Sequence, residues 1–128
     1  WAGAHLDDVM NYLPARITWL LTMLWATLLP GLSARKAWTV TLQQHAWSPG
    51  PNSGWSETAF AAALQLRLAG PIWKKGVLVS DLWLGAKGDR CEVTPQDIDR
   101  AARLSVLCSV LFAGLGWTVE QVARPYFC

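Results

Sequence analysis

Four polar side chains of chemically useful types lie close together near the start of the chain. They are two adjacent carboxylates, an amide and a guanidinium, contributed by Asp7, Asp8, Asn11 and Arg16. On a helix, Asp7 and Asn11 share a face at i,i+4 spacing, and Asp8 joins Asn11 at i,i+3. Carboxylate oxygens are ligands that Mg²⁺ prefers, and the planar fork of an arginine suits phosphate or carboxylate. This block predicts a site for a metal–nucleotide or a phosphorylated substrate, with Asp7 and Asp8 as the Mg²⁺ ligands.

A purely structural interpretation of the same block stays open. Asp7 and Asp8 would then cap a helix, and Arg16 would be a basic anchor beside a membrane. The next uncharged run, residues 17–34, contains no ionisable side chain. Charged groups crowded at the edge of such a run are costly unless they are solvated, paired or used in function.

A second block of interest is the turn-rich segment 48–57, which reads S-P-G-P-N-S-G-W-S-E. Gly, Pro, Asn and Ser in such density are typical of a loop. A loop that leads into a helix presents backbone N–H groups, which favour an anion. Neither the G-x-x-x-x-G-K-[ST] nor the G-x-G-x-x-G phosphate motif is present. The alternative is a rigid connecting loop without a ligand.

Two uncharged runs are the elements that must position these blocks. Residues 17–34 would reach about 27 Å as a helix, close to the ~30 Å core of a bilayer. Residues 104–119 form a shorter run, which needs the turns before it to cross. We therefore predict an all-α, multi-span integral membrane protein with about two membrane helices, at residues 17–34 and 104–119. A buried core helix is the alternative for the second run.

The polar connection, residues 35–103, is expected to hold loops and further helix. A helix over 56–69 would begin at Ser56, and Gly70-Pro71 would end it. Short extended or irregular pieces would follow over 72–93. Thr94 and Pro95 predict the start of the closing helix, because they suit the N-cap and the first helical position. Pro14 should kink or restart the first helix.

Composition and charge placement agree with a membrane location. The chain has 52% hydrophobic residues, 16% charged residues and nine Trp, and Trp favours membrane–water interfaces. A net charge of +2 is too small for a nucleic-acid partner. Nine of the eleven basic residues lie between the two uncharged runs, which by the positive-inside rule places the connection in the cytoplasm. A soluble interaction module with buried helices remains an alternative.

The chain begins without Met and in the middle of a pattern, so residues 1–128 are interpreted as one C-terminal part of a longer protein. The three Cys residues are widely spaced and show no C-x-x-C pair, which gives no support for zinc. Two spans without their partner helices would leave faces unpaired, so we expect the piece to be unstable alone.

Three motifs in this order resemble one family. They are D-D-x-x-N-Y-L-P-A-R before an uncharged run, P-N-S-G-W-x-E before an Ala-rich helix, and T-P-x-D-I before the closing helix. The chain resembles the CobD/CbiB family, the adenosylcobinamide-phosphate synthases of cobalamin (vitamin B12) biosynthesis, over residues 4 to 112. The chain departs from the family pattern at residues 73–76 and 81–85 and in the length of the stretch between His45 and Asn52.

The resemblance implies an amide ligase. It would use ATP and Mg²⁺ to join adenosylcobyric acid, a corrinoid, to (R)-1-amino-2-propanol or its O-phosphate. Asp7, Asp8, Asn11 and Arg16 would be catalytic, and the substrate-binding residues would be Asn52, Ser53, Gly54 and Glu57.

The resemblance further implies a multi-pass protein of the cell inner membrane, in contact with the lipid bilayer and with the site facing the cytoplasm. Other membrane proteins of the cobalamin pathway are possible partners. A non-enzymatic membrane sensor of the AmpE type is the alternative function. The presence of both polar blocks favours the enzyme, because a sensor would not need them.

Overall fold

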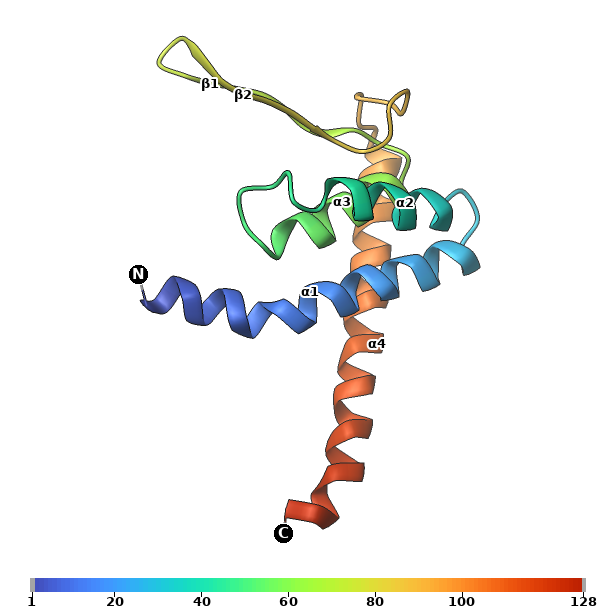
Figure 1. Cartoon of the computed structure of the whole chain (residues 1–128). Helices are drawn as coiled ribbons and strands as arrows, with labels where there is room; N and C mark the ends of the chain where they lie inside the picture. The colour runs from blue at the N-terminus through green and yellow to red at the C-terminus, as the bar shows by residue number, and fades with distance from the viewer. Residues whose placement is uncertain (1, 128) are drawn as a thin grey trace.

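A computed structural model describes residues 2–127, and in this range the chain forms four helices and one β-hairpin. The elements in chain order are α1 (Ala2–Leu28), α2 (Ala34–Gln44), α3 (Ser53–Ala63), β1 (Leu68–Lys74), β2 (Val77–Leu84) and α4 (Pro95–Phe127). Figure 1 shows α1, α2 and α3 stacked beside one another, with α4 running crosswise past all three. The hairpin projects from this body at the end where α4 begins.

The core lies where the four helices meet. Its buried members are mostly small or aliphatic, namely Leu21, Ala26, Ala37, Ala63, Leu104 and Cys108. Alanines at helix contacts let backbones approach closely. The Ala-rich body of α3 is almost completely buried between its neighbours, which fixes the position of the loop in front of it.

The prediction of a membrane span over residues 17–34 is wrong. That run is divided between the second half of α1, a turn at Pro30-Gly31 and the start of α2. Its helical part, 17–28, would be only about 18 Å long. Within residues 2–127, the single helix that is long and apolar enough to cross a membrane is Pro95–Tyr126, the body of α4.

The closing helix is longer than its uncharged core 104–119, as a crossing requires. Only 11% of its most apolar eighteen-residue stretch is buried against the rest of the chain, which differs from a core helix of a soluble protein. The start is as predicted. The Thr94 hydroxyl accepts from the Asp97 N–H at 3.3 Å, and the Asp97 carboxylate accepts from the Thr94 N–H at 3.0 Å. Arg90 donates to Asp97 at 2.9 Å, and this contact raises the pKa of the guanidinium.

Two local predictions about helix boundaries need correction. Pro14 does not restart the helix, because α1 continues as one element from Ala2 to Leu28; the other alternative, a kink at Pro14, stays a prediction. Because Pro14 has no backbone N–H, the carbonyl of Met10 lacks its helical donor. Met10 is exposed, so this carbonyl is accessible to water. The third helix begins at Ser53, after Asn52 as N-cap residue, and ends at Ala63; the predicted range was 56–69 with Ser56 as N-cap.

The β-hairpin corrects the all-α prediction. The extended pieces expected near residues 76–79 and 82–85 belong to one antiparallel partner of β1, in register from Leu68↔Leu84 to Lys74↔Val77. The strands are joined by Lys75 and Gly76, both with positive φ. Two such residues match the twist of a tight hairpin.

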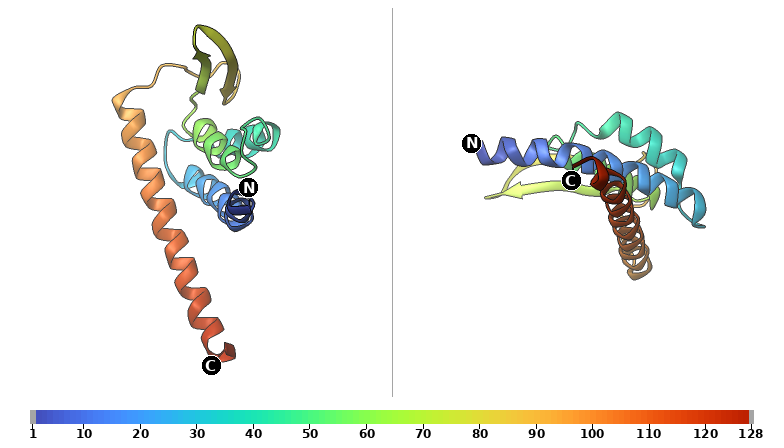
Figure 2. Two further views of the ribbon diagram at one scale, coloured as in Figure 1. Left: turned by 90° about the vertical axis from the view of Figure 1, so that its left-hand side faces the viewer. Right: turned by 90° about the horizontal axis from the view of Figure 1, so that it is seen from below.

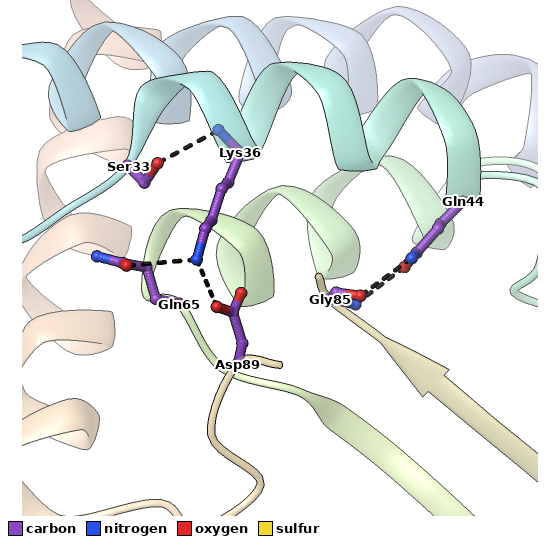
Figure 3. A network of polar contacts seen from close by, with 6 residues as sticks. All are labelled: Ser33, Lys36, Gln44, Gln65, Gly85 and Asp89. Carbon is purple, nitrogen blue, oxygen red and sulfur yellow. Dashed lines mark hydrogen bonds and ion pairs between the residues drawn. The ribbon is translucent and has the colours of Figure 1, made fainter. Parts of the chain in front are cut away.

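Polar contacts fix the base of the hairpin to the helices (Figure 3). The buried Gln44 amide at the end of α2 makes two hydrogen bonds with the backbone of Gly85, of 3.0 and 2.9 Å. Lys36 forms an ion pair with Asp89 and donates to Gln65 at 3.4 Å. The segment that follows β2 is therefore attached to α2 at two points, by Gln44 to Gly85 and by Lys36 to Asp89.

Candidate functional site

The two polar blocks come together at one pocket of about 450 Å³. One wall is the first half of α1, and the other is the loop before α3 together with the first turn of that helix (Figure 1). The lining residues are Asp7, Asp8, Asn11, Pro14, Ala15, Thr18, Gly50, Pro51, Asn52, Ser53 and Ser56. Five of the eight predicted site positions therefore face the same space, although the two blocks are about forty residues apart in sequence.

Asn52 is the side chain that ties the walls together. Its Nδ2 donates to the Asp8 backbone oxygen at 2.8 Å, and its Oδ1 accepts from Arg16 Nη1 at 3.2 Å. The residue is 9% exposed. Both ends of a nearly buried amide are thus satisfied by α1, which makes Asn52 the connection between the loop and the helix.

Arg16 is held on several sides. The same Nη1 donates to the Tyr12 backbone oxygen at 2.7 Å, and the guanidinium carbon lies 3.4 Å from the Tyr12 ring centroid and 4.8 Å from that of Trp55. Stacking between two aromatic rings favours a cation and fixes its plane. Arg16 lines a neighbouring pocket with His45, and the two pockets share Gly50 and Pro51.

The remaining α1 polar groups are also ordered. Asn11 Nδ2 donates to Asp7 Oδ1 at 2.9 Å, the i,i+4 contact that the spacing predicts. This bond leaves the other oxygen of the Asp7 carboxylate available to a ligand, and Asp8 is half-buried beside it. The negative charge of the pocket is concentrated on this wall.

Two predicted substrate-binding residues do not line this pocket. Gly54 is buried where α3 packs on the end of α2, and a Cβ at this position would lie 1.8 Å from the His45 oxygen. Its location indicates a close backbone approach. Glu57 accepts from Ser48 at 2.7 Å and lines a separate pocket of about 510 Å³ at the base of the hairpin, beside Phe60.

The side chains available in the pocket can be compared with the ligands that the predicted Mg²⁺ ion would need. In the part of the chain that the structure describes, no group of three or more His, Cys, Asp or Glu side chains could hold a metal ion. The pocket offers two neighbouring carboxylates. This chemistry fits a Mg²⁺ ion that keeps several waters and is held mainly by the phosphates of a nucleotide.

Several residues of this region were not predicted from the sequence. Ala15, Thr18 and Gly50 line the pocket without a chemical signature that would identify them. Trp55 stacks on His45 with ring centroids 4.2 Å apart and faces Arg16. The sequence signal for Trp55 was its place in the P-N-S-G-W motif, because a large ring among small residues needs a packing partner.

Comparison with known proteins gives a consistent result. The family model described as CobD/Cbib protein matches residues 1–105. A protein of Sinorhizobium sp named cobalamin biosynthesis protein CobD is 42% identical over 123 residues, covering 95% of this chain and 38% of the relative. A CobD protein of Brucella suis is 42% identical over 114 residues, covering 88% of this chain and 35% of the relative.

A more distant relative carries the other name of the family. The cobalamin biosynthesis protein CbiB of Salmonella paratyphi B is 37% identical over 113 residues, covering 88% of this chain and 34% of the relative. No solved structure matches the chain. The chain spans somewhat more than a third of the length of these curated relatives. It belongs to the CobD/CbiB family of cobalamin biosynthesis proteins.

Proposed function

We propose that this chain forms the ligand-binding part of an ATP-dependent amide ligase. The ligase joins the carboxylate of adenosylcobyric acid to the amine of (R)-1-amino-2-propanol or its O-phosphate. The observation that carries the proposal is that both polar motifs wall one pocket and are tied together through Asn52. The names of the relatives support a role in making cobalamin.

The reaction explains why such residues are needed. A carboxylate and an amine do not condense in water, because the carboxylate oxygen is a poor leaving group. ATP, when bound, would supply the γ-phosphoryl group that makes this oxygen part of a phosphate leaving group, and ADP would be released. The amine nitrogen then attacks the carbonyl carbon, loses a proton and releases the phosphate, so that one C–N bond forms and one C–O bond breaks.

The pocket residues take separate roles in this proposal. Asp7 and Asp8 would share a Mg²⁺ ion with the nucleotide phosphates, and Asn11 orients the Asp7 carboxylate. Ser53, at the first turn of α3, would present its hydroxyl and the helix N–H groups to an anion.

Arg16 is assigned as a positioning residue. Arg16 lines the neighbouring pocket that shares Gly50 and Pro51 with the first one, and it contacts the wall of the first pocket through Asn52. It would fix the loop while stabilising negative charge that develops in front of it. Glu57 would act at the neighbouring pocket near the hairpin and contribute to binding of a large substrate.

The cellular placement follows from the charges. We propose that α4 crosses the cell inner membrane and that the pocket faces the cytoplasm, where ATP is available. The segment 35–103 holds nine of the eleven basic residues and includes the loop wall of the pocket, so the positive-inside rule would place both in the cytoplasm.

A hybrid protein tests the proposed function. Because the chain spans about a third of its relatives, it would replace the aligned segment of the Sinorhizobium relative in a host lacking its own synthase. Growth on cobyric acid is the expected result. Feeding cobinamide is the control, because cobinamide already contains the amide bond and bypasses the step under test. Growth with cobinamide alone, despite hybrid protein in the membrane, would contradict the proposal and favour a sensor.

Variants of the hybrid separate chemistry from folding. Asp7→Asn combined with Asp8→Asn should abolish growth on cobyric acid, because the metal-holding oxygens lose their charge. Asp99→Asn is the matched control, since this carboxylate is exposed on α4 away from the pocket. Equal growth of both variants would remove the role assigned to Asp7 and Asp8.

A further inference from the structure

The side of α1 that faces away from the pocket carries a continuous apolar stripe. It consists of Leu6, Val9, Met10, Leu13, Ile17, Leu20, Leu24 and Leu28, which recur at the three- and four-residue steps of one helix face. All but the half-buried Ile17 are exposed, up to 71% for Val9. No Asp, Glu, Lys or Arg lies on this stripe.

The opposite side of α1 faces the other helices. Trp19 donates from its indole to the Ala37 backbone oxygen of α2 at 3.1 Å and contacts the Trp55 ring of α3. The backbone oxygen of Asp8 accepts a hydrogen bond from the Asn52 side chain. At 100° per residue, Asp8 and Trp19 fall on the same side of the helix, and Leu13 and Leu24 fall on the other. The polar and packed face of α1 therefore points toward the pocket, and its apolar face points outward.

The position of α4 relates this stripe to a membrane. In Figure 1 and in the left view of Figure 2, α2 and α3 lie on one side of α1, and the second half of α4 extends on the other. That half belongs to the helix that is apolar enough to cross a membrane. Leu104 and Cys108 mark where α4 packs against the core. The stripe of α1 and the free half of α4 therefore border the same region of space.

Charge is separated across the same boundary. Residues 104–119 of α4 are uncharged. This stretch begins where α4 packs beside α1 and continues beyond it. Lys74, Lys75 and Lys87 lie in the hairpin and the loop after it, on the far side of α2 and α3. The uncharged stretch of α4 and the apolar stripe of α1 border one region, with these lysines on its far side and the Glu120–Arg124 pair beyond it at the end of α4. This arrangement matches the chemistry of a lipid bilayer.

We propose that α1 lies in the plane of the membrane interface, with its apolar stripe in lipid, and does not span the bilayer. α4 descends beside it into the hydrocarbon. The pocket then opens at the membrane surface, on the face of α1 away from lipid. This placement is independent of the ligase chemistry, because it depends only on the stripe and on the crosswise path of α4.

Measurements of label depth in the hybrid protein test this placement. After replacement of the native cysteines by serine, a spin label would be attached at Leu6→Cys, Leu13→Cys, Leu20→Cys or Leu24→Cys, one at a time. The hybrid would be placed in vesicles of phosphatidylcholine and phosphatidylglycerol. Collision with oxygen, which concentrates in lipid, is compared with collision with a water-soluble nickel chelate. Lys87→Cys is the water reference and Val110→Cys the lipid reference, since both residues are exposed.

The in-plane position predicts a similar shallow depth at all four α1 sites, with more collisions with oxygen than with nickel. A spanning α1 would change depth by about 27 Å between residues 6 and 24, and this result would overturn the proposal. Labels that are immobilised and collide with neither reagent would mean that other parts of the protein cover the stripe. Labels that collide mainly with nickel would mean water. Either outcome would also refute the proposal.

Discussion

Replacing Asn52 by leucine is the perturbation that probes the pocket most specifically. The leucine side chain has nearly the same size and can neither donate nor accept. Asn52→Leu therefore removes the bond to the Asp8 oxygen and the bond from Arg16 while leaving the volume filled. The loop 48–52 should then separate from α1.

The magnitude follows from the two partners. The backbone oxygen of Asp8 still accepts a hydrogen bond within α1. Loss of the additional, neutral bond from Asn52 therefore costs about 0.5–1.5 kcal/mol. The bond from Arg16 involves a charge and is worth about 1.5–3 kcal/mol, reduced because Arg16 is partly exposed and keeps the Tyr12 oxygen. Together the change should destabilise the closed pocket by roughly 2–4 kcal/mol, which is between one and three powers of ten in its population.

The assay is conversion of adenosylcobyric acid by the purified hybrid in detergent, together with its thermal unfolding. Gln43→Leu is the matched control, because it also replaces an amide by leucine, on the exposed side of α2. Asn52→Leu should lose most of its activity, and the control should keep it. Equal activity and equal unfolding temperatures for both variants would refute the assignment of Asn52 as the connection between the walls.

Three further predictions concern the scaffold, each measured as the free energy of unfolding of the hybrid in detergent. Gly54→Ala should destabilise by more than about 3 kcal/mol, because its Cβ would meet backbone at the end of α2; Gly116→Ala, in open space on α4, should change stability by no more than about 1 kcal/mol. Lys36→Met should cost about 1–3 kcal/mol by leaving the Asp89 carboxylate, 7% exposed, without its cation; adding Asp89→Asn should restore part of the loss, and further loss would contradict the role of the pair. Thr94→Val should cost about 1 kcal/mol and speed amide exchange in the first turn of α4; unchanged exchange would refute the capping role.

Local chemistry made parts of the fold predictable. The cap at Thr94 and the end of α1 near Pro30-Gly31 depend on residues adjacent in sequence, and the structure has both. The i,i+4 contact between Asp7 and Asn11 likewise needs only helix geometry. These features are decided within a few residues, so their sequence signals are sufficient.

The errors arise where distant packing decides. The uncharged run 17–34 resembles a span, but Trp19 and Leu21 are buried against other helices of this chain. Residues 72–93 alternate weakly, and the hairpin depends on the Lys75-Gly76 turn and on Gln44 from α2. The two motifs of the pocket could be named from sequence, but their meeting through Asn52 required the structure.

The central claim is that substrate occupies the pocket between α1 and the loop 48–52. Alkylation of Ala15→Cys, in a hybrid otherwise free of cysteine, tests it directly, because Ala15 lines this pocket. With adenosylcobyric acid and Mg–ATP at about ten times their dissociation constants, alkylation should slow about tenfold. Lys87→Cys, on an exposed loop, should react at an unchanged rate. Equal rates with and without substrates at Ala15→Cys, in a hybrid that still supports growth, would contradict the account.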